Sequence, residues 1–136
     1  MVQMSEPTIG TKRKAVTDAI YTMLSTNIKN VEWSKYFKGF QRGKVITGAV
    51  VCDHIDYEYD AKDQCLATAT YTIIVADPDN LDTVDTIADS VFELLDCDNL
   101  NQNAEIGLVK SINYASAPTK VDAGAVLIVY EVKYYV

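Results

Sequence analysis

The chain has 136 residues, which is the length of one ordinary domain and is enough to bury a core. Hydrophobic residues make up 49% and charged residues 23%, both near globular averages, which excludes extended disorder. No apolar run approaches the ~20 residues of a membrane span, and the first ten residues lack the apolar stretch of a signal peptide.

The net charge of −7 is unevenly spread along the chain. Residues 1–44 carry eight basic and three acidic residues, a net charge of +5, whereas residues 45–136 carry four basic and sixteen acidic residues, a net charge of −12. A basic part joined to an acidic part can attract another copy of the same chain head to tail. The alternative is that both parts are solvated faces within one fold.

The first 28 residues predict a flexible arm followed by a helix. Pro7 and Gly10 interrupt regular structure, so residues 1–10 are expected to form the arm. Three consecutive basic residues beginning at Lys12 fall in the first helical turn, where their charge is unfavourable for the helix dipole. Such residues either contact a partner or are exposed to solvent. The helix is predicted from Thr11, its N-cap, to Ile28, because apolar residues recur at three- and four-residue spacing: Val16, Ile20, Met23, Leu24 and Ile28.

An aromatic segment follows, and its spacing suits one or two helical turns before Gly39 and Gly43 break the pattern. Bases interleave with these aromatic residues between Trp33 and Lys44, as a nucleic-acid stacking surface would require. Against that use, the sequence pI is about 4.5 and no nucleic-acid-binding motif is present. The favoured interpretation is that the aromatic residues close one end of the core or form a protein interface: Trp33, Tyr36, Phe37 and Phe40.

Two long strands are predicted next, from Val45 to Tyr59 and from Cys65 to Ala76, rich in the residues that a pleated surface prefers. If residues 60–63 make a symmetric turn, Tyr59 faces Gln64. One face of the hairpin then carries Tyr57, Tyr59 and Leu66, and both faces are partly apolar. Either a bulge swaps the faces midway or another subunit covers the second face.

A second helix and two closing strands complete the predicted fold. The segment Asp77–Asn80 ends the hairpin and caps a helix whose apolar stripe runs from Val84 to Leu95, with acidic residues on its wet side. Strands are expected over Ile106–Tyr114 and Val126–Val136. The predicted class is α+β in the order α-β-β-α-β-β, a largely antiparallel sheet packed by two helices, with residues 11–136 forming a single domain.

Catalytic, metal and cofactor sites are not predicted. His54 is the only histidine and lies mid-strand without a nucleophile partner, so a satisfied or partly exposed strand histidine is expected. The acids around Asp56 and Glu58 fail as a calcium loop, because Ala61 and Ala67 stand where glycine and glutamate are needed. Phosphate-binding glycine motifs are absent. Three cysteines are expected to be buried free thiols in a reducing compartment: Cys52, Cys65 and Cys97.

The order and texture of these elements resemble the tail terminator, or tail completion, proteins of long-tailed phages. The likeness covers roughly residues 11–136 and runs through the pattern Val16-x3-Ile20-x2-Met23-Leu24, the aromatic linker and the long hairpin. It continues through Tyr71-Thr72-Ile73-Ile74-Val75 and Asp77-Pro78-Asp79 into the second helix, and ends on the strand that closes at Val136.

The resemblance implies a structural virion protein that is not an enzyme and binds no cofactor. Such proteins form a homohexameric ring that caps the tail tube, contacts the tail tube protein and the head-tail connector protein, and is assembled in the host cytoplasm into the virion tail. DNA passes through the ring without specific binding, and an acidic lumen would suit that passage. A ring would also explain an apolar second hairpin face, which an intersubunit contact could cover. The interface residues expected on this reading are Tyr57, Tyr59, Leu66, Trp33, Tyr36, Phe37 and Phe40.

Two other classes stay open from the sequence. One is a small dimeric ligand-binding or regulatory module with a pocket lined by Tyr71 and Tyr114. The other is a nucleic-acid-binding protein that uses Trp33–Lys44.

Overall fold

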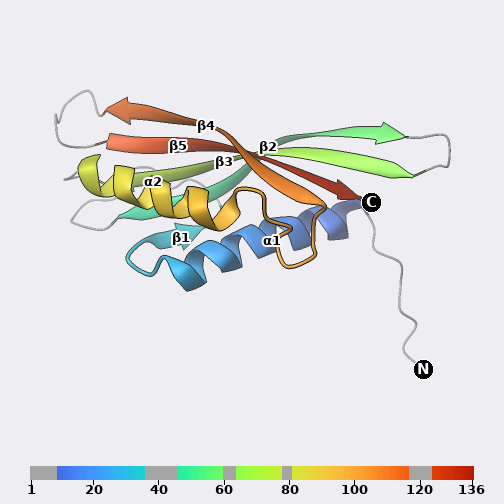
Figure 1. Cartoon of the computed structure of the whole chain (residues 1–136), viewed down its shortest axis with the longest axis horizontal. Coiled ribbons are helices and arrows are strands. Elements are labelled where there is room, and N and C mark those ends of the chain that lie inside the picture. The colour runs from blue at the N-terminus through green and yellow to red at the C-terminus, as the bar shows by residue number, and fades with distance from the viewer. Residues whose placement is uncertain (1–8, 36–45, 60–63, 78–80, 117–123) are drawn as a thin grey trace.

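The computed structural model describes residues 9–35, 46–59, 64–77, 81–116 and 124–136. Two helices, α1 (Ile9–Asn27) and α2 (Leu81–Leu95), pack on one face of a five-stranded sheet (Figure 1). This architecture confirms the predicted α+β class. The strands are β1 (Glu32–Ser34), β2 (Thr47–Tyr59), β3 (Cys65–Asp77), β4 (Ile106–Ser116) and β5 (Gly124–Tyr135).

The strand order in the sheet is β1-β2-β3-β5-β4. All neighbouring strands are antiparallel except the β1–β2 pair, which is parallel, so the sheet is largely antiparallel as predicted. Helix α1 lies over β1 and β2, whereas α2 lies over β3, β5 and β4. The two helices therefore cover opposite halves of the sheet, and each stands near a different edge strand.

The N-terminal third differs from prediction at two places. Helix α1 begins at Ile9, so Thr11 lies inside the helix rather than at its N-cap, and residues 1–8 of the expected arm lie outside the described residues. The aromatic segment was expected to be helical, but β1 occupies its start, because Val31 and Trp33 are buried while Glu32 between them is exposed. This two-residue alternation is the strand period, and it prevails over the helical spacing of the aromatic residues. Residues 36–45 lie outside the described residues.

A β-bulge at Asp53 divides the long hairpin into two registers. From Thr47 to Cys52 the pairing follows the predicted symmetric register, with Cys52 opposite Tyr71. From His54 onward the pairing shifts by one residue, so Tyr59 lies opposite Cys65 rather than Gln64. Because one extra residue in a strand moves all later side chains to the other face, the bulge alternative is confirmed.

The core contains three tyrosines whose side chains are almost fully buried: Tyr71, Tyr130 and Tyr134. The hydroxyl of Tyr130 donates to the carbonyl oxygen of Leu95 at 2.7 Å and so ties the sheet to the end of α2. Gly107 makes room for this contact, since a Cβ at that position would lie 1.8 Å from the Tyr130 hydroxyl oxygen. The Tyr134 hydroxyl has no hydrogen-bond partner.

The three cysteines are free thiols, as predicted, but their exposure differs from expectation. Cys65 is buried, Cys52 is half-buried and Cys97 is exposed. Cys97 lies just after the end of α2 and has a left-handed backbone, at a φ of 57°.

Candidate interaction surfaces

The described residues offer no cluster suited to metal binding, since no three His, Cys, Asp or Glu side chains come together there. His54 is exposed and its Nε2 lies 2.9 Å from a carboxylate oxygen of Asp56, an exposed residue on the same strand. Neither helix is both long and apolar enough to cross a membrane.

The bulge separates the hairpin residues that the sequence placed together. Tyr57 pairs with Ala67, whose side chain is buried beneath the helices, so Tyr57 and Tyr59 point to the helix side of the sheet. Leu66 points to the opposite side and is half-buried. The exposed fractions of Tyr57 and Tyr59 are 38% and 67%. The tyrosines are thus available to a partner, but they do not share a face with Leu66.

Trp33 lies within the core of the single chain. Its exposed fraction is 8%, its ring packs against Gly48, and its Nε1 donates to the carbonyl oxygen of Ile28 at 2.9 Å. Burial leaves little of this ring for stacking on a nucleic acid or for contact with another subunit. The other aromatic residues expected at an interface lie outside the described residues: Tyr36, Phe37 and Phe40.

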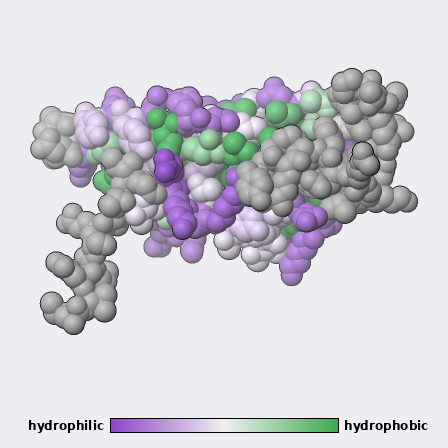
Figure 2. Space-filling view, turned by 180° about the vertical axis from the view of Figure 1, so that it is seen from behind, coloured by the Kyte–Doolittle hydropathy of each residue, from purple (hydrophilic) through white to green (hydrophobic). Residues whose placement is uncertain are grey.

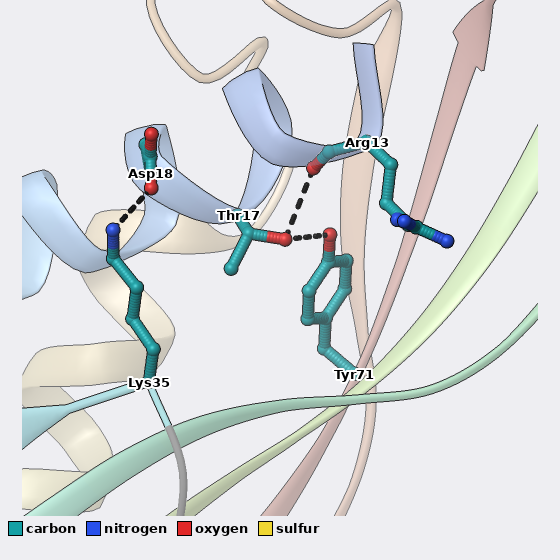
Figure 3. Close-up of polar contacts among 5 residues, drawn as sticks. All are labelled: Arg13, Thr17, Asp18, Lys35 and Tyr71. Carbon is teal, nitrogen blue, oxygen red and sulfur yellow. Dashed lines mark hydrogen bonds and ion pairs between the residues drawn. The ribbon is translucent and has the colours of Figure 1, made fainter. Parts of the chain in front are cut away.

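The two tyrosines expected to line a ligand pocket stand apart. Tyr71 on β3 is buried beneath α1, whereas Tyr114 on β4 is 58% exposed beside α2. In Figure 3 the Tyr71 hydroxyl meets the Thr17 hydroxyl at 2.8 Å, and Thr17 in turn donates to the carbonyl oxygen of Arg13. Because the single Thr17 hydroxyl proton goes to that carbonyl, Tyr71 is the donor to Thr17. Burial raises the pKa of Tyr71, which keeps its hydroxyl protonated.

A basic surface lies where α1 meets the β2 edge of the sheet. Lys35 pairs with Asp18 and stands 5.4 Å from the ring centre of Tyr21, whereas Arg13 points away from this pair (Figure 3). Burial raises the pKa of the Cys52 thiol, and the charge of Arg13 partly opposes that rise. An open concavity of 570 Å³ lies here, lined by Thr11, Arg13, Lys14, Thr17, Asp18, Lys35 and Cys52.

An acidic surface lies at the other end of the sheet, where α2 meets β4. Asp85 and Asp89 are exposed on the outer side of α2, and Phe92 on the same helix side is 42% exposed. The Tyr114 hydroxyl donates to a carboxylate oxygen of Asp85 at 2.5 Å, and this hydrogen bond raises the pKa of Tyr114. Residues 81–98 contain six acidic residues and no basic residue.

The sheet face away from the helices has no covering layer among the described residues. Threonines and half-buried aliphatic side chains alternate there with the core residues, as the burial of β3 and β5 shows. Seen from behind, apolar patches lie among hydrophilic residues (Figure 2). This mixed surface suits neither full solvation nor a dry core.

Two features of the acidic surface were missed from the sequence. Phe92 follows the polar side of α2 at a spacing of three residues from Asp89, and that single aromatic break in an acidic row was the available signal. Asp96 accepts the backbone N–H of Val109 at 2.9 Å, and the backbone N–H of Gly107 donates to the carbonyl oxygen of Asp98 at 2.8 Å. These two contacts satisfy part of the outer edge of β4, and no sequence pattern indicates them.

The fold is shared with a chain of a solved virion, described as the virion of a native gene transfer agent particle. The two chains superpose with a TM-score of 0.68 at 15% sequence identity, over 91% of this chain and 97% of that chain. A second solved chain has 17% identity over 91% of this chain and 94% of its own length, and its TM-score is 0.44. No protein-family model and no curated protein matches the sequence.

Proposed function

We propose that the chain is a non-enzymatic structural protein of a phage-like particle. The observation that carries this proposal is the superposition with the gene transfer agent virion chain, which spans nearly the whole of both chains. The described residues add support, because several aromatic side chains are exposed: Tyr59 at 67%, Tyr114 at 58% and Phe92 at 42%. Exposed aromatic side chains are characteristic of protein interfaces.

Within that class, we propose the role of a tail terminator, a ring that caps the tail tube and joins it to the head connector. The resemblance of the element order to that family supports the role, together with the polarity of the charges along the chain. Subunits with opposite charge on two surfaces favour head-to-tail contacts, which close into a ring when the rotation permits. The proposed neighbours are six copies in one ring, the tail tube protein and the head-tail connector protein, with DNA passing through the lumen.

The hairpin tyrosines are the proposed subunit contacts, with Tyr59 as the more exposed of the two. Leu66 lies on the other sheet face and would contact a different neighbour or the lumen side. Tyr57→Asp and Leu66→Asp are both expected to reduce assembly while leaving a folded monomer. If both variants assemble like the native chain, the hairpin is not the interface.

The first experiment is the solution mass, measured by light scattering over a protein dilution series, with negative-stain images of the same sample. Six copies of the 15.1 kDa chain have a mass of about 91 kDa, and rings of that mass are the expected result. A tight dimer without rings would instead support a regulatory module. A chain that remains monomeric is then mixed with purified tail tubes that lack a terminator, and absence of capped tube ends would refute the role.

The second experiment deletes the gene in the strain that produces the particle. Loss of a terminator is expected to give heads and tails that fail to join, with tails of irregular length in electron micrographs. Restoration by the native gene is the control. Normal particles from the deletion strain would contradict a structural role in the tail.

A further inference from the structure

The fold places the basic and acidic parts of the sequence near opposite edges of the sheet, on the face that the helices cover. Helix α1 covers β1 and β2 at one side, and α2 extends over β5 and β4 at the other. Residues 9–35 carry five basic and two acidic residues, whereas residues 81–98 carry six acidic residues and no basic ones. The acids of β2 (Asp53, Asp56 and Glu58) lie on the sheet face away from the helices, so the helix-covered face is basic over α1 and acidic over α2.

The basic side combines positive charge with exposed tyrosine. Arg13 and Lys14 are exposed and line the 570 Å³ concavity, and the described residues place no acidic side chain in an ion pair with either. Cys52 of β2 lines the same concavity as Arg13, and Tyr57 lies farther along β2 on the helix side of the sheet. Tyr59 continues this surface toward the hairpin end.

The acidic side combines negative charge with exposed aromatic rings in the same way. Asp85, Asp89 and Phe92 follow one another in a row along the side of α2 that faces β4. Tyr114 of β4 joins this row through its hydrogen bond to Asp85. Within the described chain no lysine or arginine pairs with these acids. Each side thus offers charged residues around aromatic anchors, and the signs of the charges are opposite.

The strand edges at the two sides are also incompletely covered. Strand β1 pairs only with Thr47–Ala49, so the described residues leave the outer edge of β2 from Val50 to Tyr59 without a paired strand. On β4, contacts from Asp96 and Asp98 satisfy the edge at Gly107 and Val109, and the described residues show no such contact farther along the strand. Within the described residues, both edges therefore include backbone groups that another chain could pair with.

We infer that copies of this chain bind one another through these two surfaces. The acidic α2–β4 side of one subunit lies against the basic α1–β2 side of the next. The two surfaces differ, so the contact is head-to-tail, and an open assembly keeps one free surface of each sign, one at each end, for the next copy. The inference deepens the proposed ring, since it assigns the surfaces that meet. It rests on that function only for the closure of the chain of contacts into a ring.

The test exchanges the charges of the two sides in separate variants. Arg13→Glu with Lys14→Glu reverses the two exposed positive charges that line the concavity, and Asp85→Lys with Asp89→Lys reverses the two exposed negative charges next to Phe92 and Tyr114. Each double variant alone is expected to associate about 100-fold more weakly than the native chain, because like charges then face each other across the contact. An equimolar mixture is expected to recover native assembly, with the two variants alternating around the ring.

Control variants each reverse one charge on or just after the same helices at a position away from the proposed contact, which is half the charge change of a double variant. The controls are Lys29→Glu and Glu93→Lys. Lys29 lies just after the C-terminal end of α1, and Glu93 lies on the side of α2 toward α1; both line the groove that contains Asn27 and Leu94. Both controls should assemble like the native chain. Circular dichroism and thermal melting verify that every variant is folded, and light scattering at low and high salt reports assembly, which added salt should weaken.

Three results would overturn the inference. The double variants could assemble as well as the native chain, the mixture could fail to recover assembly although both variants are folded, or the native chain could stay monomeric at every concentration and on tubes. If the mixture does recover rings but those rings fail to cap tail tubes, the surface assignment stands and the terminator role fails. If native rings cap tubes and the charge variants do so equally, the role stands and the surface assignment fails.

Discussion

Replacing Gly107 by alanine tests the contact that joins the sheet to the end of α2. The new Cβ would lie 1.8 Å from the hydroxyl oxygen of Tyr130 and 2.3 Å from its Cζ. Tyr130 is fully buried, so its ring has no open space into which to move. No left-handed φ is recorded at Gly107, so alanine brings no backbone strain of its own, and the damage comes from the collision.

The expected loss follows from two consequences of that collision. Overpacking a filled core costs about 1–3 kcal/mol, and breaking the 2.7 Å bond to the Leu95 carbonyl adds about 1–3 kcal/mol because the buried Tyr130 hydroxyl loses its acceptor. Alanine returns about 0.4–1 kcal/mol by restricting the unfolded chain. The net loss of unfolding free energy is therefore about 1–5.5 kcal/mol.

Urea denaturation monitored by circular dichroism measures this loss. With an m value of about 2 kcal/mol/M, the midpoint should fall by about 0.5–3 M. Ser111→Ala, on an exposed position of the same strand, is the control and should change stability by less than about 0.5 kcal/mol. In a Tyr130→Leu background, the cost of Gly107→Ala should largely disappear. A loss below about 0.5 kcal/mol for Gly107→Ala in the native background would refute the reasoning.

Three further predictions concern the tyrosines and α1. Thr17→Val should cost about 1–2 kcal/mol in urea denaturation, because the buried Tyr71 hydroxyl loses its acceptor, and an unchanged midpoint would contradict the bond. Burial raises the pKa of Tyr134 to about 12, so the unfolded chain loses this proton first, and stability should fall as the pH rises from about 10 to 12. In an alkaline titration of near-UV absorbance, Tyr71, Tyr130 and Tyr134 should ionise together with unfolding, and their ionisation in the folded chain would be inconsistent with burial. Tyr59→Ser should weaken self-association without lowering the melting temperature, since this ring is 67% exposed, and a large fall in melting temperature would contradict its surface position.

Regular patterns in the sequence were sufficient to predict the main elements. The stripe that contains Val16, Ile20 and Leu24 is buried as a helix face, and the alternation that ends at Tyr134 is buried as a strand face. Both patterns repeat over many residues, so local noise in one position does not alter the period. The extent of both helices and of the four long strands was accordingly close to prediction.

Features that depend on a single residue were not determined by those patterns. The bulge at Asp53 was one of two alternatives, because an inserted residue changes pairing without changing composition. Strand β1 was missed because three residues are too few for the strand period to outweigh the helical spacing of the neighbouring aromatic residues. That Arg13 and Tyr57 belong to one surface could be seen only in the tertiary structure, since 43 residues separate them in the chain.

The carboxylate of Asp96 has a consequence for how copies of the chain meet. It already accepts the Val109 N–H, which is the kind of donor that a stray strand from any unfolded neighbour would seek. Such a strand would have to displace a charged acceptor from the sheet margin, and an apolar aggregation-prone segment has no equivalent to offer in exchange. At Val109 the edge of β4 therefore disfavours pairing with an arbitrary strand. Contact between copies is then expected to depend on side chains rather than on backbone pairing at this position.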